Sequence, residues 1–482
     1  MDFDVLIVGA GVVGCAVARE LSRYEGKIGV LERGFDVAEG ASKANSGIVH
    51  AGFDAKPGSL KAKLNVQGAN IYPDLCRELG VPYSQPGALV LGFTEEDRKT
   101  LENLVRQGEE NGVEGVRLLG RQQVLKKEPN VNPGVQCALY APTSGLTSPY
   151  ELTFALADHA ALNGACFLLG QEVMEVTRTQ DGLWQVSCGE KTYTCRVLVN
   201  CAGVNGAYIH NMLCDDRLSI IPRRGEYYLL DKMEKLPFQM TVFQCPNAMG
   251  KGVLATPTVH GNLLLGPSAE DIADNQDVAT TAQGLAFVLK KSALTWPEIS
   301  IRNSITNFSG IRAHEKKGDF VIGSPAENAY EAVGIESPGL SAAPAIARML
   351  AEQIATEQNL TQKAEFLPPA KRKKPFYEMN DRERAEAVQE DPLYGNLVCR
   401  CEMVTEAEIV AAIHRPVGAT TIDGVKRRTR SGMGRCQGGF CSPSVAEILA
   451  RELGIPLTQV TKSGGESYLL TGSVAQTLKE ER

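Results

Sequence analysis

Three glycines near the start of the chain limit its possible folds more than any other feature. Gly9, Gly11 and Gly14 follow an apolar run of strand character and precede a segment with helical periodicity. Glu32 closes the next strand-like run, about 20 residues further on, where an acid can accept hydrogen bonds from a ribose. Glycines at this spacing let backbone amides approach a pyrophosphate at a helix N-terminus. The pattern predicts a βαβ unit that binds a dinucleotide, against the alternative of a glycine-rich turn without a ligand. It does not separate FAD from NAD.

Bulk composition narrows the class of protein. The chain has 482 residues and a net charge of −7, with 43% hydrophobic residues. This length is typical of about three domains, and the acidic balance argues against a nucleic-acid-binding protein. We recognise neither a signal peptide nor a transmembrane segment, and the thirteen cysteines then favour a reducing compartment. We expect a cytoplasmic protein. Any association with a membrane is expected to be peripheral and to pass through a partner subunit. Cys15, Cys166, Cys195 and Cys201 lie in apolar runs and are expected in the core.

Four further cysteines near the C-terminus form two tight pairs. Cys399 and Cys401 are separated by one residue, and Cys436 and Cys441 by four. Two pairs of thiolates predict a metal site. Zinc is the main alternative to an iron–sulfur cluster, although the cysteine pairs of zinc sites are usually separated by two residues. The third interpretation is a vestigial site that holds no metal.

Several longer motifs carry a resemblance to known families. The segments ANSGIVHAG, PRRGEYYLLD, GKGVLATPTVHGNLLLGP, FSGIRAHE and GIESPGLSAAPAI make residues 1 to about 355 similar to the flavoproteins related to D-amino-acid oxidase and glycine oxidase. Within that family the chain most resembles FAD-dependent glycerol-3-phosphate dehydrogenases and oxidases, followed by L-2-hydroxyglutarate oxidases. The four cysteines resemble the 2Fe–2S domain of bacterioferritin-associated ferredoxin. The resemblance thus implies two cofactors, FAD and a 2Fe–2S cluster bound by Cys399, Cys401, Cys436 and Cys441.

The expected fold is α/β and has three parts. A Rossmann-like FAD-binding domain is expected at residues 1–85, 145–215 and 305–358, interleaved with an α+β substrate domain of mixed or antiparallel sheet at 86–144 and 216–304. The polar segment 359–395, with Pro-Pro and a basic KRKK run, is expected to be a linker. A small helical iron–sulfur domain follows at 396–455, and the tail 456–482 carries no recognisable signal.

Alcohol oxidation on a flavin requires a group that accepts the hydroxyl proton. His50 lies in a polar, glycine-lined loop, and a histidine titrates near neutral pH. In the glycerol-3-phosphate enzymes the residues that match Ser46 and His50 lie beside the flavin. The resemblance therefore implies His50 as the base, against the alternative that it only orients FAD.

An anionic substrate also needs cationic side chains. Arg312 presents a planar fork that matches phosphate or carboxylate oxygens. Lys251 and Ser337 match residues that line the same pocket in the glycerol-3-phosphate subgroup. The glycerol-3-phosphate oxidases commonly have proline after this arginine, whereas Ala313 and His314 follow it here, and His314 either adds a donor to the anion or reshapes the turn. Arg223 and Arg224 are weaker candidates for the anion.

The expected contacts to FAD come from several separated segments. Gly339, Leu340 and Ser341 open a predicted helix whose N-terminal amides can stabilise negative charge on a reduced flavin. The full set of expected FAD-binding residues is Gly9, Gly11, Gly14, Glu32, Ser42, Asn45, Ser46, Val173, Ala202, Gly203, Gly310, Gly339, Leu340 and Ser341.

A basic stretch lies between the cysteine pairs. It contains Lys426, Arg427, Arg428, Arg430 and Arg435. These cations could favour a reduced cluster, form a solvated loop, or provide a docking patch for an acidic redox partner.

Three functions remain open from the sequence. The first is an FAD-dependent dehydrogenase that oxidises sn-glycerol 3-phosphate to dihydroxyacetone phosphate, with electrons leaving through the cluster to an electron-accepting subunit or carrier. The second is the same chemistry on L-2-hydroxyglutarate or another 2-hydroxy acid. The third is a non-catalytic flavin and iron–sulfur electron-transfer subunit.

Overall fold

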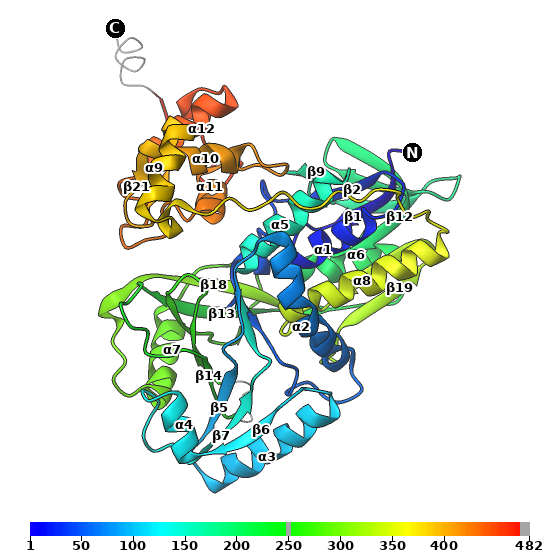
Figure 1. The fold of residues 1–482 in the computed structure, drawn as a ribbon. Helices are drawn as coiled ribbons and strands as arrows, with labels where there is room; N and C mark the ends of the chain where they lie inside the picture. The colour runs from blue at the N-terminus through cyan, green and yellow to red at the C-terminus, as the bar shows by residue number, and fades with distance from the viewer. Residues whose placement is uncertain (247–251, 473–482) are drawn as a thin grey trace.

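The computed structural model describes residues 1–246 and 252–472, which form two large sheets and a small C-terminal helical unit (Figure 1). No helix in this part of the chain is long and apolar enough to cross a membrane.

The first sheet has eight strands and carries the glycine loop. Its strands are β1 (Phe3–Val8), β2 (Ile28–Glu32), β9 (Cys166–Leu169), β10 (Glu175–Arg178), β11 (Trp184–Cys188), β12 (Lys191–Asn200), β19 (Val321–Ala326) and β20 (Ala329–Val333). Strands β9, β2, β1, β12 and β20 are parallel neighbours. Leu6 and Ile7 on β1 are fully buried on opposite faces, as expected for a parallel sheet covered on both sides.

The helices around this sheet are α1 (Val12–Leu21), α2 (Leu60–Leu79), α5 (Pro149–Leu162), α6 (Gly206–Leu213) and α8 (Gly339–Glu357). Helices α2 and α8 approach each other closely at Gly68. A Cβ atom there would lie 1.9 Å from the carbonyl oxygen of Ser341, so only glycine allows this contact. The long helix α2 is thereby held against the start of α8.

The second sheet has nine strands. They are β5 (Ala88–Gly92), β6 (Arg117–Gly120), β7 (Cys137–Ala141), β13 (Ile220–Leu230), β14 (Thr241–Gln244), β15 (Leu254–Pro257), β16 (Leu263–Gly266), β17 (Glu270–Asp271) and β18 (Ser304–Glu315). The helices that pack near this sheet are α3 (Glu95–Glu110), α4 (Arg121–Lys127) and α7 (Ala282–Thr295). A separate small sheet consists of β3 (Ile48–Val49), β4 (Tyr83–Ser84) and β8 (Gly145–Thr147). Strand β18 pairs along its length with β13, so Arg312 belongs to the nine-stranded sheet.

The C-terminal unit contains α9 (Asp381–Glu390), β21 (Leu397–Cys399), β22 (Val404–Thr405), α10 (Glu406–Ile413), α11 (Ile422–Thr429) and α12 (Ser442–Leu453). Helix α9 lies within the segment expected to be a linker. Its N-terminus is stabilised by a capping box, in which Asn380 and Glu383 bond each other's backbone amides. Figure 1 shows the helices of this unit gathered beside α5.

One core prediction is wrong. Cys15, Cys195 and Cys201 are buried, but Cys166 is exposed. It starts β9, which is an edge strand of the eight-stranded sheet and is covered less than the central strands.

Candidate active site and cysteine site

The glycine loop is shaped for close backbone approach. Gly9 has a φ of +102°, and a Cβ atom on Gly14 would lie 1.9 Å from the Gly9 carbonyl oxygen. The loop can therefore turn tightly from β1 into α1 only with glycine at these positions. Ser42 Oγ accepts a hydrogen bond from the Val12 amide at the first turn of α1 (2.8 Å).

Glu32 is held at the end of β2 by the same loop. Its carboxylate accepts hydrogen bonds from the amides of Ala10 and Gly34, each at 2.8 Å. Burial raises the pKa of Glu32, although both amides act in the opposite direction. The acid thus lies beside the glycines, as the dinucleotide pattern requires.

A cavity of about 330 Å³ extends from this loop to the nine-stranded sheet. It brings together most of the predicted site residues: Gly9, Gly11, Glu32, Ser42, Asn45, Ser46, His50, Ala202, Gly203, Gly310, Arg312, Ser337, Gly339 and Leu340. The backbone cradle around Gly9 and Gly14, with the acid beside it, fits the phosphates and ribose of FAD.

Three predicted contacts do not line this cavity. Gly14 packs beneath Gly9, and Val173 is buried in a hydrophobic cluster with β1 and β11. Ser341 is fully buried, and its Oγ accepts a hydrogen bond from the His50 amide at 2.7 Å. Lys251 lies outside the described residues, and its neighbour Gly252 lines the cavity.

The loop that carries His50 is fixed by two helices. Besides Ser341 on α8, the fully buried Asn65 on α2 donates its side-chain amide to the His50 carbonyl oxygen (3.1 Å). The His50 ring lies near Phe243, with 5.8 Å between ring centroids. The histidine is therefore held by packing between α2, α8 and β14.

Arg312 lies on β18, directly opposite Arg223 on β13. Its Nη2 donates to the Ser268 carbonyl oxygen at 3.0 Å. Arg223 makes a two-point contact with Asp271, while Arg224 pairs with Glu270 and Asp277. Of these three arginines, Arg312 alone lines the cavity, so the structure favours it over Arg223 and Arg224 as an anion contact.

His314, near the position where the oxidases commonly have proline, has a structural role. His314 Nδ1 lies 3.0 Å from the carboxylate of Glu336, which also accepts from Lys61 Nζ at 2.8 Å. Burial tends to raise the pKa of Glu336, but the contacts with Lys61 and His314 outweigh it and lower the pKa. His314 is thus engaged with a carboxylate that lines the cavity.

Sequence reasoning missed two aromatic residues of the cavity. Phe243 lies beside His50, and Tyr227 on β13 stacks on Phe308 of β18, with ring centroids 4.9 Å apart and planes 14° apart. Tyr227 lies in a run of four consecutive buried residues of β13, so no alternating pattern marks it, and its partner Phe308 depends on strand register.

The four cysteines line one pocket of about 790 Å³. Cys401 and Cys436 have Sγ atoms 3.6 Å apart, and Cys399 contacts Cys441. Cys399 and Cys441 are buried, whereas Cys401 is exposed. Among the described residues, no three His, Cys, Asp or Glu side chains converge on a single metal ion. The two thiol pairs suit a two-iron cluster better than one tetrahedral ion.

Backbone amides approach the thiols of this pocket. The contact with Cys441, together with amides from Gly432 and Glu402, lowers the pKa of Cys399, while the same contact raises the pKa of Cys441. Amides that point at sulfur favour the thiolate, which is the form that binds iron. The donor set and its surroundings therefore fit a 2Fe–2S cluster.

The basic stretch between the cysteine pairs is not a solvated loop. Arg428 contacts both oxygens of Asp36 (2.6 and 2.7 Å), and Arg427 bonds Asp36 at 3.0 Å and also Glu39. The Arg428 side chain is 0% exposed and that of Asp36 4%. These arginines attach the cysteine unit to the loop that follows Glu32.

Other pairs extend this attachment. Asp158 on α5 accepts hydrogen bonds from Arg415 and from the Val417 amide. Arg430 bonds Glu402 within the cysteine unit and Asn262 near the nine-stranded sheet. Lys232 also bonds Glu402. Arg435 pairs with Asp231, although its side chain is mostly exposed. The unit is therefore fixed against both large sheets.

With this geometry in place, comparisons with known proteins define the class. Residues 4–353 match the model of the FAD dependent oxidoreductase family, and residues 397–451 match that of the BFD-like [2Fe-2S] binding domain. The chain belongs to the FAD-dependent oxidoreductase family and carries a C-terminal 2Fe–2S domain, so it is an enzyme with two redox cofactors.

Three relatives of known activity are similar to this chain to different extents. A glycerol 3-phosphate dehydrogenase from Caloramator mitchellensis is 46% identical over 473 residues, which cover 98% of each chain. The FAD-bound structure of L-alpha-glycerophosphate oxidase from Mycoplasma pneumoniae has a TM-score of 0.73 and 31% identity, covering 77% of this chain and 99% of the other. A mitochondrial L-2-hydroxyglutarate dehydrogenase from Bos taurus is 30% identical over 285 residues, which are 56% of this chain and 61% of that protein.

Proposed function

We propose that this enzyme oxidises sn-glycerol 3-phosphate to dihydroxyacetone phosphate. The observation that carries the proposal is the 46% identity with a glycerol 3-phosphate dehydrogenase over nearly the full length of both chains. The cavity supports it because a histidine and an arginine that could hold an anion line the same space as the FAD-binding glycines.

Each polar side chain of the cavity has a distinct role in this proposal. His50 accepts the proton of the secondary hydroxyl as the carbinol carbon loses hydride. The Arg312 guanidinium binds the phosphate through paired N–H donors, while Ser46 and Ser337, which line the same cavity, orient the substrate. Lys251, outside the described residues, is proposed as a second phosphate contact because its neighbour Gly252 lines the cavity.

The fixed position of His50 serves proton transfer. Ser341 and Asn65 hold the backbone on both sides of its side chain, so the ring needs little reorganisation when the substrate binds. Phe243 and Tyr227 supply apolar walls that exclude water from the reacting carbon.

The cofactors define where the electrons go. FAD supplies the hydride acceptor, and the 2Fe–2S cluster supplies a one-electron site from which a partner subunit or carrier is reduced. The exposed Cys401 lies at the outer side of the cysteine pocket, where such a partner can approach.

A 2-hydroxy acid is the second candidate substrate. An arginine fork binds carboxylate as readily as phosphate, and L-2-hydroxyglutarate dehydrogenases are among the relatives. The matches of these dehydrogenases cover 56% to 73% of this chain, against 98% for the glycerol 3-phosphate dehydrogenase, so we rank this substrate second.

An anaerobic titration separates the two substrates. Glycerol 3-phosphate should bleach the flavin absorbance of the purified, FAD- and cluster-loaded protein and produce the EPR signal of a reduced 2Fe–2S cluster. Bleaching by L-2-hydroxyglutarate alone would replace the first candidate by the second. Absence of bleaching by either would refute both.

A further inference from the structure

A cavity of about 1000 Å³, which we call the middle cavity, lies between the loop that borders FAD and the cysteine unit. Asn45 and Ser46 line both this cavity and the FAD cavity, and Met433 and Gln437 of the cysteine unit line its other side. Electrons that leave FAD for the cluster have to cross this region. Electron transfer falls off with distance, and it falls off faster across a gap than through packed atoms. Packed contacts at the border of the middle cavity therefore provide the more effective route.

On the FAD side, the loop is packed tightly against the segment that enters α5. Gly47 follows Ser46 and has a φ of +68°, and a Cβ atom on it would lie 2.4 Å from the Thr147 carbonyl oxygen. The Thr147 amide donates to the Gly47 carbonyl oxygen at 2.9 Å. Glycine is required for this close approach. The loop that borders FAD is thus joined directly to the residues that precede Tyr150.

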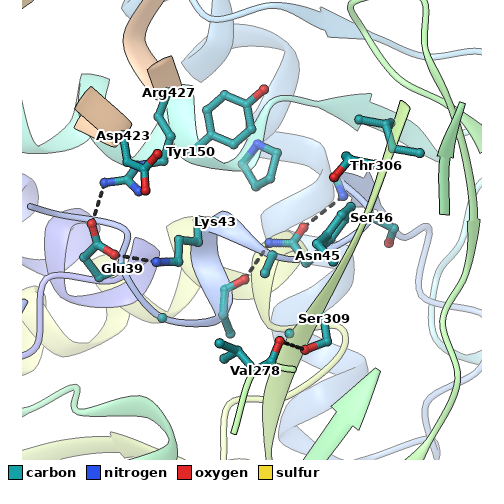
Figure 2. A pocket seen from close by; sticks show the side chains of 18 of the residues that line it. Glu39, Lys43, Asn45, Ser46, Tyr150, Val278, Thr306, Ser309, Asp423 and Arg427 are labelled. Atoms are coloured by element: carbon teal, nitrogen blue, oxygen red, sulfur yellow. Dashed lines mark hydrogen bonds and ion pairs between the residues drawn. The ribbon is translucent and has the colours of Figure 1, made fainter. Parts of the chain in front are cut away.

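Tyr150 reaches from the start of α5 to the cysteine unit. Its hydroxyl donates to Met433 Sδ at 3.7 Å and accepts from Arg430 Nη1 at 3.5 Å. The ring is half-buried and lines the middle cavity. Figure 2 shows Tyr150 at the same cavity as Asn45 and Ser46 of the loop. One aromatic side chain thus connects the FAD-binding part of the chain with the cysteine unit.

Both contacts of the tyrosine hydroxyl lead to Cys401. Gly434 follows Met433, and a Cβ atom on it would lie 2.4 Å from Cys401 Cβ and 3.5 Å from Cys401 Sγ. Arg430 Nε bonds Glu402, the residue after Cys401, at 2.8 Å. A continuous series of contacts therefore joins the loop beside FAD to one of the four cysteines of the 2Fe–2S domain.

The ion pairs of Asp36 form a second link, but this link starts at the other end of the FAD cavity. Asp36 lies four residues after Glu32, the acid that the dinucleotide pattern assigns to the ribose. The Tyr150 link starts at Gly47, three residues before His50, the proposed proton acceptor. The flavin ring has to lie where the substrate loses hydride, so the Tyr150 link begins nearer to the reduced ring.

We propose that Tyr150 and Met433 bridge the two cofactors and carry electrons from reduced FAD to the 2Fe–2S cluster. The inference rests on the proposed function, because a substrate has to reduce FAD first. Reduced FAD returns to FAD by losing two electrons and releasing its proton to solvent. The cluster accepts one electron at a time, and each passes to a one-electron acceptor outside the chain. Tyr150 and Met433 form and break no bonds in this step, so they act as positioning residues.

Rapid mixing of the FAD- and cluster-loaded protein with glycerol 3-phosphate, without oxygen, tests the bridge. Flavin absorbance follows the first step, and EPR of samples frozen at successive times follows reduction of the cluster. Tyr150→Leu should bleach its flavin at the unaltered rate. Its cluster should be reduced about 10- to 100-fold more slowly, because the ring that spans the two parts is lost. Met433→Ala should show the same separation of the two steps.

Two further variants separate a bridge from general packing. Tyr150→Phe keeps the ring and should recover most of the lost rate of cluster reduction. Among the described residues, Tyr208 provides a matched control, because it is 51% exposed on α6 and lines neither cavity nor the cysteine pocket. Tyr208→Leu should match the unaltered protein in both steps.

The midpoint potential of the cluster gives a readout that does not depend on turnover. A dye-mediated titration of Tyr150→Leu and Met433→Ala should return the potential of the unaltered protein, because all four cysteines remain. Slower reduction at an unchanged potential assigns the loss to the bridge. Iron and FAD contents verify folding, and Met433→Ala decides the question if Tyr150→Leu loses either cofactor.

Three results would overturn the proposal. The first is cluster reduction at the unaltered rate in loaded Tyr150→Leu and Met433→Ala variants. The second is equal slowing in Tyr208→Leu. The third is a shift of the cluster potential large enough to account for the slower rate.

Failure of the proposed function gives a different result. Neither glycerol 3-phosphate nor L-2-hydroxyglutarate then bleaches the flavin, whatever the variant. Illumination in the presence of EDTA reduces bound FAD directly in that case. The rate of cluster reduction after the light pulse then tests the bridge in the same variants.

Discussion

The FAD cavity and the cysteine pocket are built in opposite ways. The FAD cavity takes its walls from residues between Gly9 and Leu340, which belong to several strands, helices and loops. In the part of the chain that the structure describes, the cysteine pocket takes its walls from residues between Asn396 and Arg451. One site requires the global fold, whereas the other requires a short local unit, and buried ion pairs join the two.

The strongest test of this separation removes one thiol. Cys401→Ser should abolish the 2Fe–2S cluster while FAD remains bound, because none of the described residues beyond Leu340, up to residue 472, lines the FAD cavity. Cys401 is exposed, so the substitution removes little core packing. Iron analysis and flavin absorbance measure the two contents, and a parallel loss of FAD would show that the two sites depend on each other.

His50→Asn tests the FAD side of the comparison. We expect kcat for the proposed substrate to fall about 100- to 10,000-fold while both cofactors stay bound, because only proton transfer is lost. His414→Gln is the matched control, since His414 is exposed on the cysteine unit and pairs with Glu452. Equal kcat values for the two variants would exclude His50 as the base.

The junction between the regions is tested at Asp36. Asp36→Asn leaves Arg427 and Arg428 buried without their carboxylate, which should cost about 3–5 kcal/mol. Hydrogen exchange of the α11 amides reports this loss. Asp74→Asn removes an acid from an exposed pair with Arg77 and should leave exchange unchanged.

The same junction predicts a pH dependence. Burial tends to raise the pKa of Asp36, but Arg428 and Arg427 outweigh it and lower the pKa below its ordinary value. A lowered pKa stabilises the junction fully above the unfolded value of about 4, and this stabilisation is lost as the pH falls through the lower folded value. Exchange in α11 should therefore accelerate in acid and stay constant from pH 6 to 8, and an equal acceleration in the Asp36→Asn variant would contradict this origin.

A smaller effect is expected for the substrate anion. Arg312→Ala should raise KM about 10- to 100-fold with FAD still bound, because the guanidinium supplies charged hydrogen bonds to the phosphate. Arg223→Ala is the matched control, because Arg223 lies opposite on β13 and already pairs with Asp271. Steady-state kinetics measures KM for both variants. An equal rise in the two KM values would contradict the assignment of Arg312 to the substrate phosphate.

The smallest effect is expected on the outer face of the cysteine unit. Phe440 is 88% exposed, so Phe440→Ser should change the free energy of unfolding by less than about 0.5 kcal/mol. Leu449→Ala, at a fully buried position of the same unit, should cost about 2–5 kcal/mol. Chemical denaturation of both variants provides the comparison, and a large loss for Phe440→Ser would mean that the ring packs in solution.

The sequence predicted those features that a local pattern determines. The glycine spacing indicated the turn between β1 and α1, and the run after Pro338 indicated the start of α8. The cysteine spacing indicated a pocket made by one short segment. In each case the residues that form the feature are close together in the chain.

Contacts between distant segments were not predictable. The basic stretch at the end of α11 allowed a solvated loop, because its acidic partner Asp36 lies 392 residues away from Arg428. The stacking of Tyr227 on Phe308 depends on the register of β13 and β18, which a single sequence does not specify. The edge position of β9, which exposes Cys166, follows from the order of strands in the sheet.

The charged junction has a consequence for the continuity of the chain. Lys371 and Lys373, in the segment before α9, are exposed and not followed by proline, so trypsin can cleave there. The contacts of Asp36 and Asp158 with the cysteine unit do not pass through that segment. Two fragments cut at this point should therefore elute together from a sizing column at neutral pH and separate in acid.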